Sequence, residues 1–298
     1  MKTKPKSILS LLCLLVFTSF ITGCGETVIS EDQMQERNGL VYTVNQESPF
    51  TGVVVKHYEN GQKELEQRYK DGIKDGIWID WYPNGQVKSE KIYKDGWRDG
   101  KRTDWYDSGQ KKYEANYKDG WLDKWWGWHE NGQIKEEQTY KDGKKDGEAY
   151  EWYENGQMSK ETTYKRGMED GRETTWHQNG QMSGEWNYKN GKTDGMLTGW
   201  YANGQKKYEE NYKGGEINGK RNNWHQNGKK AYEATYKDGK RDGKCTEWYQ
   251  NGQIKEEATY KDGKKDGRLT SWHWNGKVAK VETYEDGELI EEKIYSPE

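Results

Sequence analysis

The feature that most constrains the fold of this chain is a repeat of 24 residues. Asn-Gly-Gln triplets, or close variants, recur from Asn60 to Asn275 at intervals of 24 residues, except for one interval of 23 between Ser108 and Asn131. A fixed period of 20–50 residues is typical of repeat arrays, in which each copy contacts mainly its neighbours. A Tyr and a Trp recur in step with the triplets: Tyr69, Tyr93, Tyr117, Tyr140, Tyr164, Tyr188, Tyr212, Tyr236, Tyr260 and Tyr284, and Trp81, Trp105, Trp128, Trp152, Trp176, Trp200, Trp224, Trp248 and Trp272.

The composition argues against a conventional globular enzyme. Only 30% of the residues are hydrophobic, and Leu, Ile, Val and Phe together make up about an eighth of the chain. A two-layer domain of this size needs far more aliphatic side chain for its interior, which argues against Rossmann, TIM-barrel and helix-bundle folds. The 16 Trp and 22 Tyr residues argue equally against disorder, because disordered chains are poor in aromatic residues.

One copy, residues 131–154, shows what each repeat encodes. Residues 134–140 alternate between the two sides as a strand does, Asp142-Gly143 and Asp146-Gly147 indicate a turn, and residues 149–153 are rich in β-formers. The Asn155-Gly156 pair that follows predicts a tight hairpin, with both central residues at positive φ. The sequence therefore predicts an all-β, elongated ribbon of tandem antiparallel hairpins without a globular core. Ten copies occupy residues 60–298, the last of them with a C-terminal cap.

The N-terminus is typical of a bacterial lipoprotein. Three lysines precede an apolar stretch from Ile8 to Ile21, which is too short for a membrane-spanning helix and suits a signal peptide. Ile21-Thr22-Gly23-Cys24 resembles a lipobox, which predicts cleavage after residue 23 and lipidation of Cys24. An ordinary signal peptide with a chance Cys is the alternative. Residues 24–39 are expected to form a polar tether, and residues 40–59 a capping hairpin.

The repeated string resembles a known family. Tyr140-Lys-Asp-Gly-Lys-Lys-Asp-Gly147, followed by Trp152-Tyr153 and Asn155-Gly156, resembles the MORN repeat, and more closely the bacterial variant repeats of YwqK-like antitoxin proteins. The resemblance covers residues 40–295. It implies a ribbon of β-hairpins and a role in interaction, and it provides no catalytic residues.

Several groups of residues are candidates for binding. The cluster Trp121, Trp125, Trp126 and Trp128 breaks the regular pattern and is our candidate partner surface. A Glu stands three residues before nine of the ten recurring Tyr, at positions 66, 90, 114, 137, 161, 185, 209, 233 and 257. It forms either an acidic ladder for a cationic partner or a solvated face whose charge is offset by lysines two residues earlier, Lys88, Lys112, Lys135, Lys207 and Lys255.

No cofactor, metal or catalytic site is expected. The five His residues recur in or beside the Trp positions, too far apart to share a metal, and are interpreted as substitutes for aromatic residues. Cys245 is expected to be a small apolar strand residue, because no base stands near it.

These observations favour a non-enzymatic, membrane-anchored lipoprotein that presents an extended β-surface to an unknown protein partner. Its expected location is the bacterial cell envelope, at an outer membrane or the cell surface. The alternatives are an antitoxin or immunity protein, and a binder of cell-wall glycan or choline through exposed aromatic rings. A formal net charge of −3 without a basic stripe argues against nucleic acid as a partner.

Overall fold

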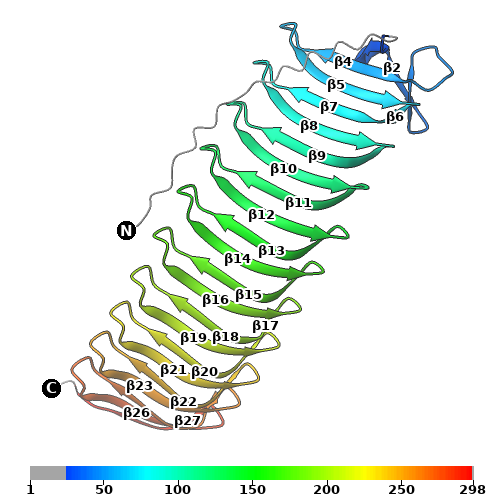
Figure 1. Ribbon diagram of the computed structural model, residues 1–298. Helices are drawn as coiled ribbons and strands as arrows, with labels where there is room; N and C mark the ends of the chain where they lie inside the picture. Colours follow the sequence, from blue (N-terminus) through cyan, green and yellow to red (C-terminus); the bar gives the residue numbers. More distant parts are fainter. Residues whose placement is uncertain (1–24, 297–298) are drawn as a thin grey trace, which may run out of the picture.

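A computed structural model describes residues 25–296 and confirms the all-β ribbon. Its main sheet has 25 strands, and from residue 52 onward it is an antiparallel meander. Three of the strands are two-residue segments, and each of these pairs with the same preceding strand as the strand that follows it. Figure 1 shows the result, a long ribbon of bowed strands that runs from a cap at the N-terminal end to the last hairpin. The described residues include no helix longer than the 3₁₀ turn η1 (Glu31–Gln33).

The strands near the N-terminus are β1 (Val28–Ser30), β2 (Met34–Arg37), β3 (Leu40–Thr43) and β4 (Gly52–His57). The array continues with β5 (Lys63–Lys70), β6 (Ile73–Lys74), β7 (Gly76–Trp81), β8 (Val87–Lys94), β9 (Trp97–Trp105), β10 (Lys111–Lys118), β11 (Trp121–Trp128), β12 (Ile134–Lys141), β13 (Lys144–Trp152), β14 (Met158–Lys165), β15 (Met168–Trp176), β16 (Met182–Lys189), β17 (Lys192–Thr193) and β18 (Gly195–Trp200). The remaining strands are β19 (Lys206–Lys213), β20 (Glu216–Trp224), β21 (Lys230–Lys237), β22 (Lys240–Trp248), β23 (Ile254–Lys261), β24 (Lys264–Lys265), β25 (Gly267–Trp272), β26 (Val278–Glu285) and β27 (Glu288–Ile294).

The tight hairpins lie at the Asp-Gly pairs, which corrects the prediction for the Asn-Gly pairs. Asp142 and Gly143 both have positive φ, 49° and 71°, as a two-residue type I′ turn requires. At the other edge of the ribbon, Gly156 has a φ of 81° but Asn155 is not in the left-handed region. The Tyr153 amide donates to the Gln157 carbonyl across three intervening residues, as in a hairpin loop that ends in a glycine bulge.

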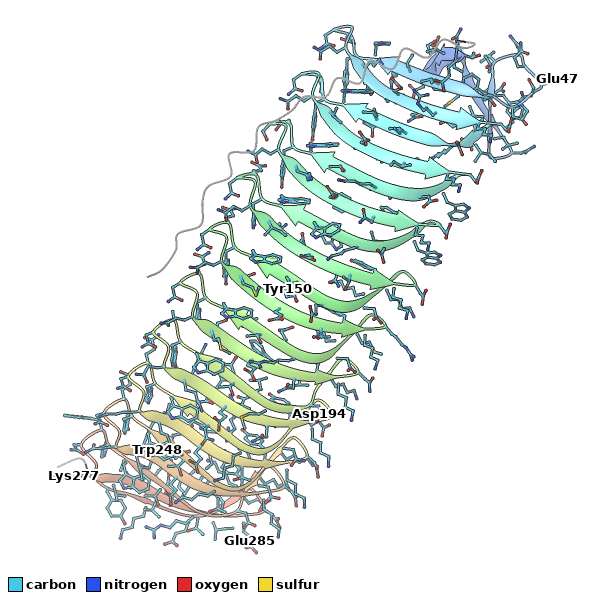
Figure 2. The ribbon with its side chains drawn as sticks, viewed as in Figure 1. Glu47, Tyr150, Asp194, Trp248, Lys277 and Glu285 are labelled. Carbon is cyan, nitrogen blue, oxygen red and sulfur yellow. The ribbon has the colours of Figure 1, made fainter. Side chains whose placement is uncertain are left out.

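Alternation along the strands gives the sheet two different faces. The Tyr face carries the recurring Tyr together with the residues two and four positions before it, such as Tyr117, Ala115 and Tyr113. The opposite side, here called the Glu face, carries the recurring Glu and the Trp series. Tyr150 and Trp248, both labelled in Figure 2, belong to the Glu face. Figure 2 also shows the side chains arranged in rows that run across the strands.

The N-terminal cap differs from the expected tether and hairpin. Residues 28–37 form β1, η1 and β2: β1 pairs parallel with β4 and covers the first strand of the array, whereas β2 pairs with β3 in a separate two-stranded sheet. Burial of Ile29 with Val41, Phe50 and Val54 explains this arrangement, because these apolar side chains form a small core over Tyr69 and Trp78. The segment is therefore part of the fold rather than a polar linker.

The signal peptide and Cys24 lie outside the described residues. Within residues 25–296, no helix has the length and apolar character needed to cross a bilayer.

Candidate functional site

A ladder of side-chain hydrogen bonds ties each copy to the next along the Asn-Gly edge. In every copy but the last, the residue after the Trp position reaches the carbonyl of the Trp in the following copy, as Tyr82 does to Trp105 at 2.8 Å. His129, His177 and His225 make the same contact through Nε2 at 2.9–3.0 Å. The interpretation of these histidines as substitutes for aromatic residues is therefore confirmed.

The Asn residues form a second ladder along the same edge. Asn155 accepts from the Gln157 amide through Oδ1, which shapes its own turn, and donates through Nδ2 to the Gln178 carbonyl of the next turn. The same inter-copy bond recurs from Asn60, Asn84, Asn131, Asn179, Asn203, Asn227 and Asn251. These repeated residues hold the array together, which accounts for their recurrence without a role in binding.

The Glu face is neutralised by lysines and arginines, which favours the solvated-face interpretation. Glu114 accepts from Lys111 at 2.8 Å and Lys101 at 2.9 Å. Burial opposes the charged form of Glu114, but these hydrogen bonds outweigh it and lower the pKa of its carboxyl group. Lys63, Lys206 and Lys230 pair with Glu66, Glu209 and Glu233 in the same way.

The lysines that we expected to offset the Glu ladder are not the ones that pair with it. Each of them, such as Lys112, is the extra residue of a β-bulge, between Lys111, which pairs with Trp105, and Tyr113, which pairs with Asp104. The bulge turns these lysines away from the Glu ladder. Lys88, Lys112 and Lys207 instead lie over the rings of Tyr82, Tyr106 and Tyr201, respectively.

The structure does not bring the four candidate tryptophans together on one surface. Trp125 and Trp126 are neighbours in β11 and face opposite sides, since Trp125 pairs with Ala115 and Trp126 with Glu114. Trp121 lies at the Asp-Gly edge, 62% exposed. The ring of Trp128 lies under Lys111, a residue of the Glu face. Of the four, Trp125 and Trp128 line the hollow described next.

A hollow of about 520 Å³ lies over β7–β12, on the Tyr face and the adjoining Asn-Gly edge. Five cationic and three acidic side chains line it, with aromatic residues between them: Lys88, Lys91, Arg102, Lys112, Lys135, Asp80, Asp104, Glu136, Tyr82, Trp105, Tyr106, Tyr113, Trp125 and Trp128. Ser89 and Gly127 also line it. Their small size leaves room at positions where other copies carry Tyr or Glu, as at Tyr208 and Glu151.

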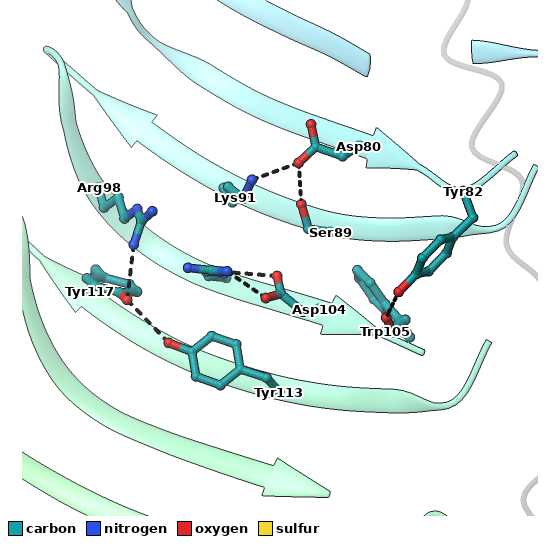
Figure 3. Close-up of polar contacts among 10 residues, drawn as sticks. Asp80, Tyr82, Ser89, Lys91, Arg98, Asp104, Trp105, Tyr113 and Tyr117 are labelled. Carbon is teal, nitrogen blue, oxygen red and sulfur yellow. Dashed lines mark hydrogen bonds and ion pairs between the residues drawn. The ribbon is translucent and has the colours of Figure 1, made fainter. Parts of the chain in front are cut away.

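Paired charges form part of the hollow's lining (Figure 3). Asp80 accepts from Lys91 at 2.7 Å and from the Ser89 hydroxyl at 2.5 Å. Arg102 donates to both carboxylate oxygens of Asp104 at 2.6 and 3.1 Å, and this hydrogen bonding raises the pKa of its guanidinium against the effect of burial. These charges are therefore engaged within the protein.

A hydrogen-bonded chain continues beside the hollow. Figure 3 shows Arg98 donating to the Tyr117 hydroxyl, which in turn lies 3.3 Å from the Tyr113 hydroxyl. Burial, followed by this contact, raises the pKa of Tyr113. Tyr113 therefore stays neutral at physiological pH and gives the hollow an uncharged aromatic wall.

The shortened copy provides the other wall. This copy lacks one residue and its second Gly. The bulge of β11 therefore has a single extra residue, Asp123, which lies between Leu122, paired with Tyr117, and Lys124, paired with Asn116. Trp125 thereby pairs with Ala115, and its ring lies 5.5 Å from that of Tyr113. Its indole Nε1 is buried and has no hydrogen-bond partner among residues 25–296. The sequence signalled this feature through the 23-residue spacing, but it did not show which tryptophan faces the hollow.

Two further expectations concern individual residues. Cys245 is a buried free thiol in β22, packed with Ala234, Ala258 and Leu269, as predicted for a small apolar strand residue. Burial raises the pKa of its thiol. Among residues 25–296, no three His, Cys, Asp or Glu side chains converge as metal ligands would.

Comparison with known proteins identifies the repeats. The family model described as MORN repeat variant matches residues 74–95, 98–119, 127–142, 145–166, 169–190, 193–213, 217–238 and 241–262. No curated protein matches the chain. The matched segments cover more than half of the sequence and follow the hairpin period of the structure. This chain therefore belongs to the MORN repeat variant family.

Proposed function

We propose that this protein is a lipid-anchored, non-enzymatic binding protein of the bacterial cell envelope, and that it presents the Tyr face to a protein partner. Repeat proteins commonly use an extended surface in this way. The lipobox that ends at Cys24 supports the anchor, and the residue after it, Gly25, is not the Asp that retains such proteins at an inner membrane. Multiple acyl chains would hold the protein firmly.

The observation that carries the proposal is the contrast between repeated and variable positions. The Tyr/His and Asn ladders use the same residue types along the array. In contrast, the partly exposed column of the Tyr face that stands four residues before the recurring Tyr changes from copy to copy, with Tyr113, Glu136, Lys160, Tyr208, Tyr232, Glu256 and Lys280 at equivalent strand positions. A framework alone does not need this variety, whereas a recognition surface does.

Two measurements test the anchor and the partner separately. Mass spectrometry of the membrane fraction should show a diacylglyceryl adduct on Cys24, and Cys24→Ala should release soluble protein. Affinity purification of the acylated protein from detergent-solubilised envelope should then yield one protein in a constant molar ratio. Hydrolysis of a substrate by the mature protein, mapped to one copy, would overturn the non-enzymatic assignment.

One observation favours a second candidate function, the binding of wall glycan or choline. Trp97 and Trp121 are 68% and 62% exposed on neighbouring turns of the Asp-Gly edge, where their rings could stack on sugars or cations. Retention on peptidoglycan or choline resin, lost in Trp97→Ala, would support this candidate. The antitoxin role rests on the resemblance alone, and absence of rescue when a neighbouring toxic protein is co-expressed would count against it.

A further inference from the structure

Building on the proposed function, we infer that the hollow over β7–β12 binds an extended acidic peptide segment whose carboxylates recur at every third residue. The inference names the chemistry of the partner segment and the side chains that recognise it. It rests on three lysines, on their spacing, and on the aromatic rings beneath two of them.

Lys88, Lys112 and Lys135 occupy the same bulge position in three successive copies, and all three line the hollow. In the following copies this position holds Ser159, Ser183, Lys207, Ala231, Lys255 and Ala279. A run of three lysines thus coincides with the hollow. The charges of Lys88 and Lys112 are available, since neither lysine forms an ion pair among residues 25–296, whereas Lys135 forms a long ion pair with Glu136 at 3.7 Å.

The three lysines form a row across the strands. Each copy contributes two strands about 4.8 Å apart, so neighbouring lysines are about 10 Å apart. A polyproline II segment rises about 3.1 Å per residue with three residues per turn, which brings every third side chain to the same side at about 9 Å. In a β-strand, residues three apart face opposite sides. The lysine row therefore matches a polyproline II segment with an acidic residue at every third position.

The aromatic rings favour a peptide over a glycan. Sugars stack on open ring faces, but the ring faces of Tyr82 and Tyr106 are occupied by Lys88 and Lys112, at 5.7 and 5.3 Å from the ring centroids. The rings are fixed in turn by their hydroxyl bonds to the Trp105 and Trp128 carbonyls. The tyrosines thus hold the lysines toward the ligand rather than stacking on it.

Isothermal titration of the full mature protein with synthetic peptides tests the inference. The probe is a peptide of about a dozen residues that repeats Glu-Pro-Ala, and its control has the same composition with the glutamates adjacent. We expect the periodic peptide to bind at low salt at least several-fold more tightly than the clustered one, and to weaken as salt rises. Equal affinity for the two peptides, or no binding of either, would overturn the inference.

Matched variants locate the site. Replacing Lys88, Lys112 and Lys135 together by Gln should lower the affinity for the periodic peptide about tenfold or more, because each exposed charge contact contributes a few-fold. Lys207→Gln with Lys255→Gln, at the same bulge position outside the hollow, should leave it unchanged. Circular dichroism and urea midpoints equal to those of the parent protein establish that both variants are folded. Equal losses in the two variants would refute the assignment of the site.

Two further outcomes separate the inference from the proposed function. Tighter binding of oligogalacturonate than of the periodic peptide would refute the peptide assignment in favour of an anionic glycan. If the triple Gln variant still captures the envelope partner in full, the inference fails and the proposed function stands. If the parent protein proves to be a hydrolase, the proposed function itself fails, whatever the peptides do.

Discussion

Replacement of His177 by Phe should destabilise the array, whereas replacement by Tyr should not. The His177 Nε2 lies 3.0 Å from the Trp200 carbonyl, and in other copies a Tyr hydroxyl makes this bond at 2.7–2.9 Å. Phe keeps the ring but removes the donor, so a half-buried carbonyl loses its partner. A hydrogen bond of this kind contributes about 1 kcal/mol, and an unsatisfied group adds to the loss, which gives an expected cost of about 1–2 kcal/mol.

Urea unfolding followed by Trp fluorescence measures the effect, and amide hydrogen exchange localises it. Because stability in a repeat array is set largely by neighbouring copies, the loss of protection should centre on β15–β18. His273 provides a matched control. It stands in the same position of the last copy, where its Nε2 is buried without a hydrogen-bond partner among residues 25–296. His273→Phe should therefore cost nothing measurable.

Equal destabilisation by His177→Phe and His273→Phe would refute this reasoning, because only one of the two removes a bond. A cost for His177→Tyr as large as that for His177→Phe would refute it as well. In that case the histidines would have a role that tyrosine cannot fill, and their alternation with tyrosine would need another explanation.

Two further predictions concern charge and turn chemistry. The pKa of Glu114 is lowered from the usual 4.5 by Lys111 and Lys101, so its stabilising effect is present above that pH and is lost as the pH falls through the lowered value. The difference in unfolding free energy between Glu114→Gln and the parent protein should therefore vanish in acid, and a constant difference would contradict the ion pairs. Ser108 replaces the ladder Asn in one copy, so Ser108→Asn should raise stability by about 0.5–1 kcal/mol and Asn155→Ser should lower it by as much, both measured by urea midpoints.

Much of the fold could be predicted because a repeat makes the period visible ten times. The alternation of residues between Ile134 and Tyr140 predicted a strand there. The recurrence of the Trp and Asn positions, such as Trp128 and Asn131, predicted how one copy aligns with the next. The turn types could not be assigned so well. Asp-Gly and Asn-Gly both permit positive φ, and the number of residues between paired strands, rather than the dipeptide, selects the type I′ turn.

The hollow could not be predicted from the repeat pattern, because it depends on single-residue differences within the copies. Simple alternation places Lys112 on the same side as Glu114, and a bulge of one residue reverses this. Likewise, the spacing marked β11 as irregular, but the shorter bulge decides that Trp125 faces the hollow and Trp126 the other side. A cap was predicted for residues 40–59, but the part of it formed by residues 28–37 was not, because its few apolar residues, such as Ile29, are separated by polar ones and are brought together with Val41 only by tertiary packing.

Site-specific photocrosslinking at Trp125 and Trp126 tests most directly whether the Tyr face binds the partner. The two positions are adjacent in β11, so they share the same strand, copy and distance from the anchor, and they differ in the face they occupy. With benzoylphenylalanine at each position in acylated protein, the account predicts crosslinking of the envelope partner from position 125 and none from position 126. Crosslinking from position 126 alone would contradict it.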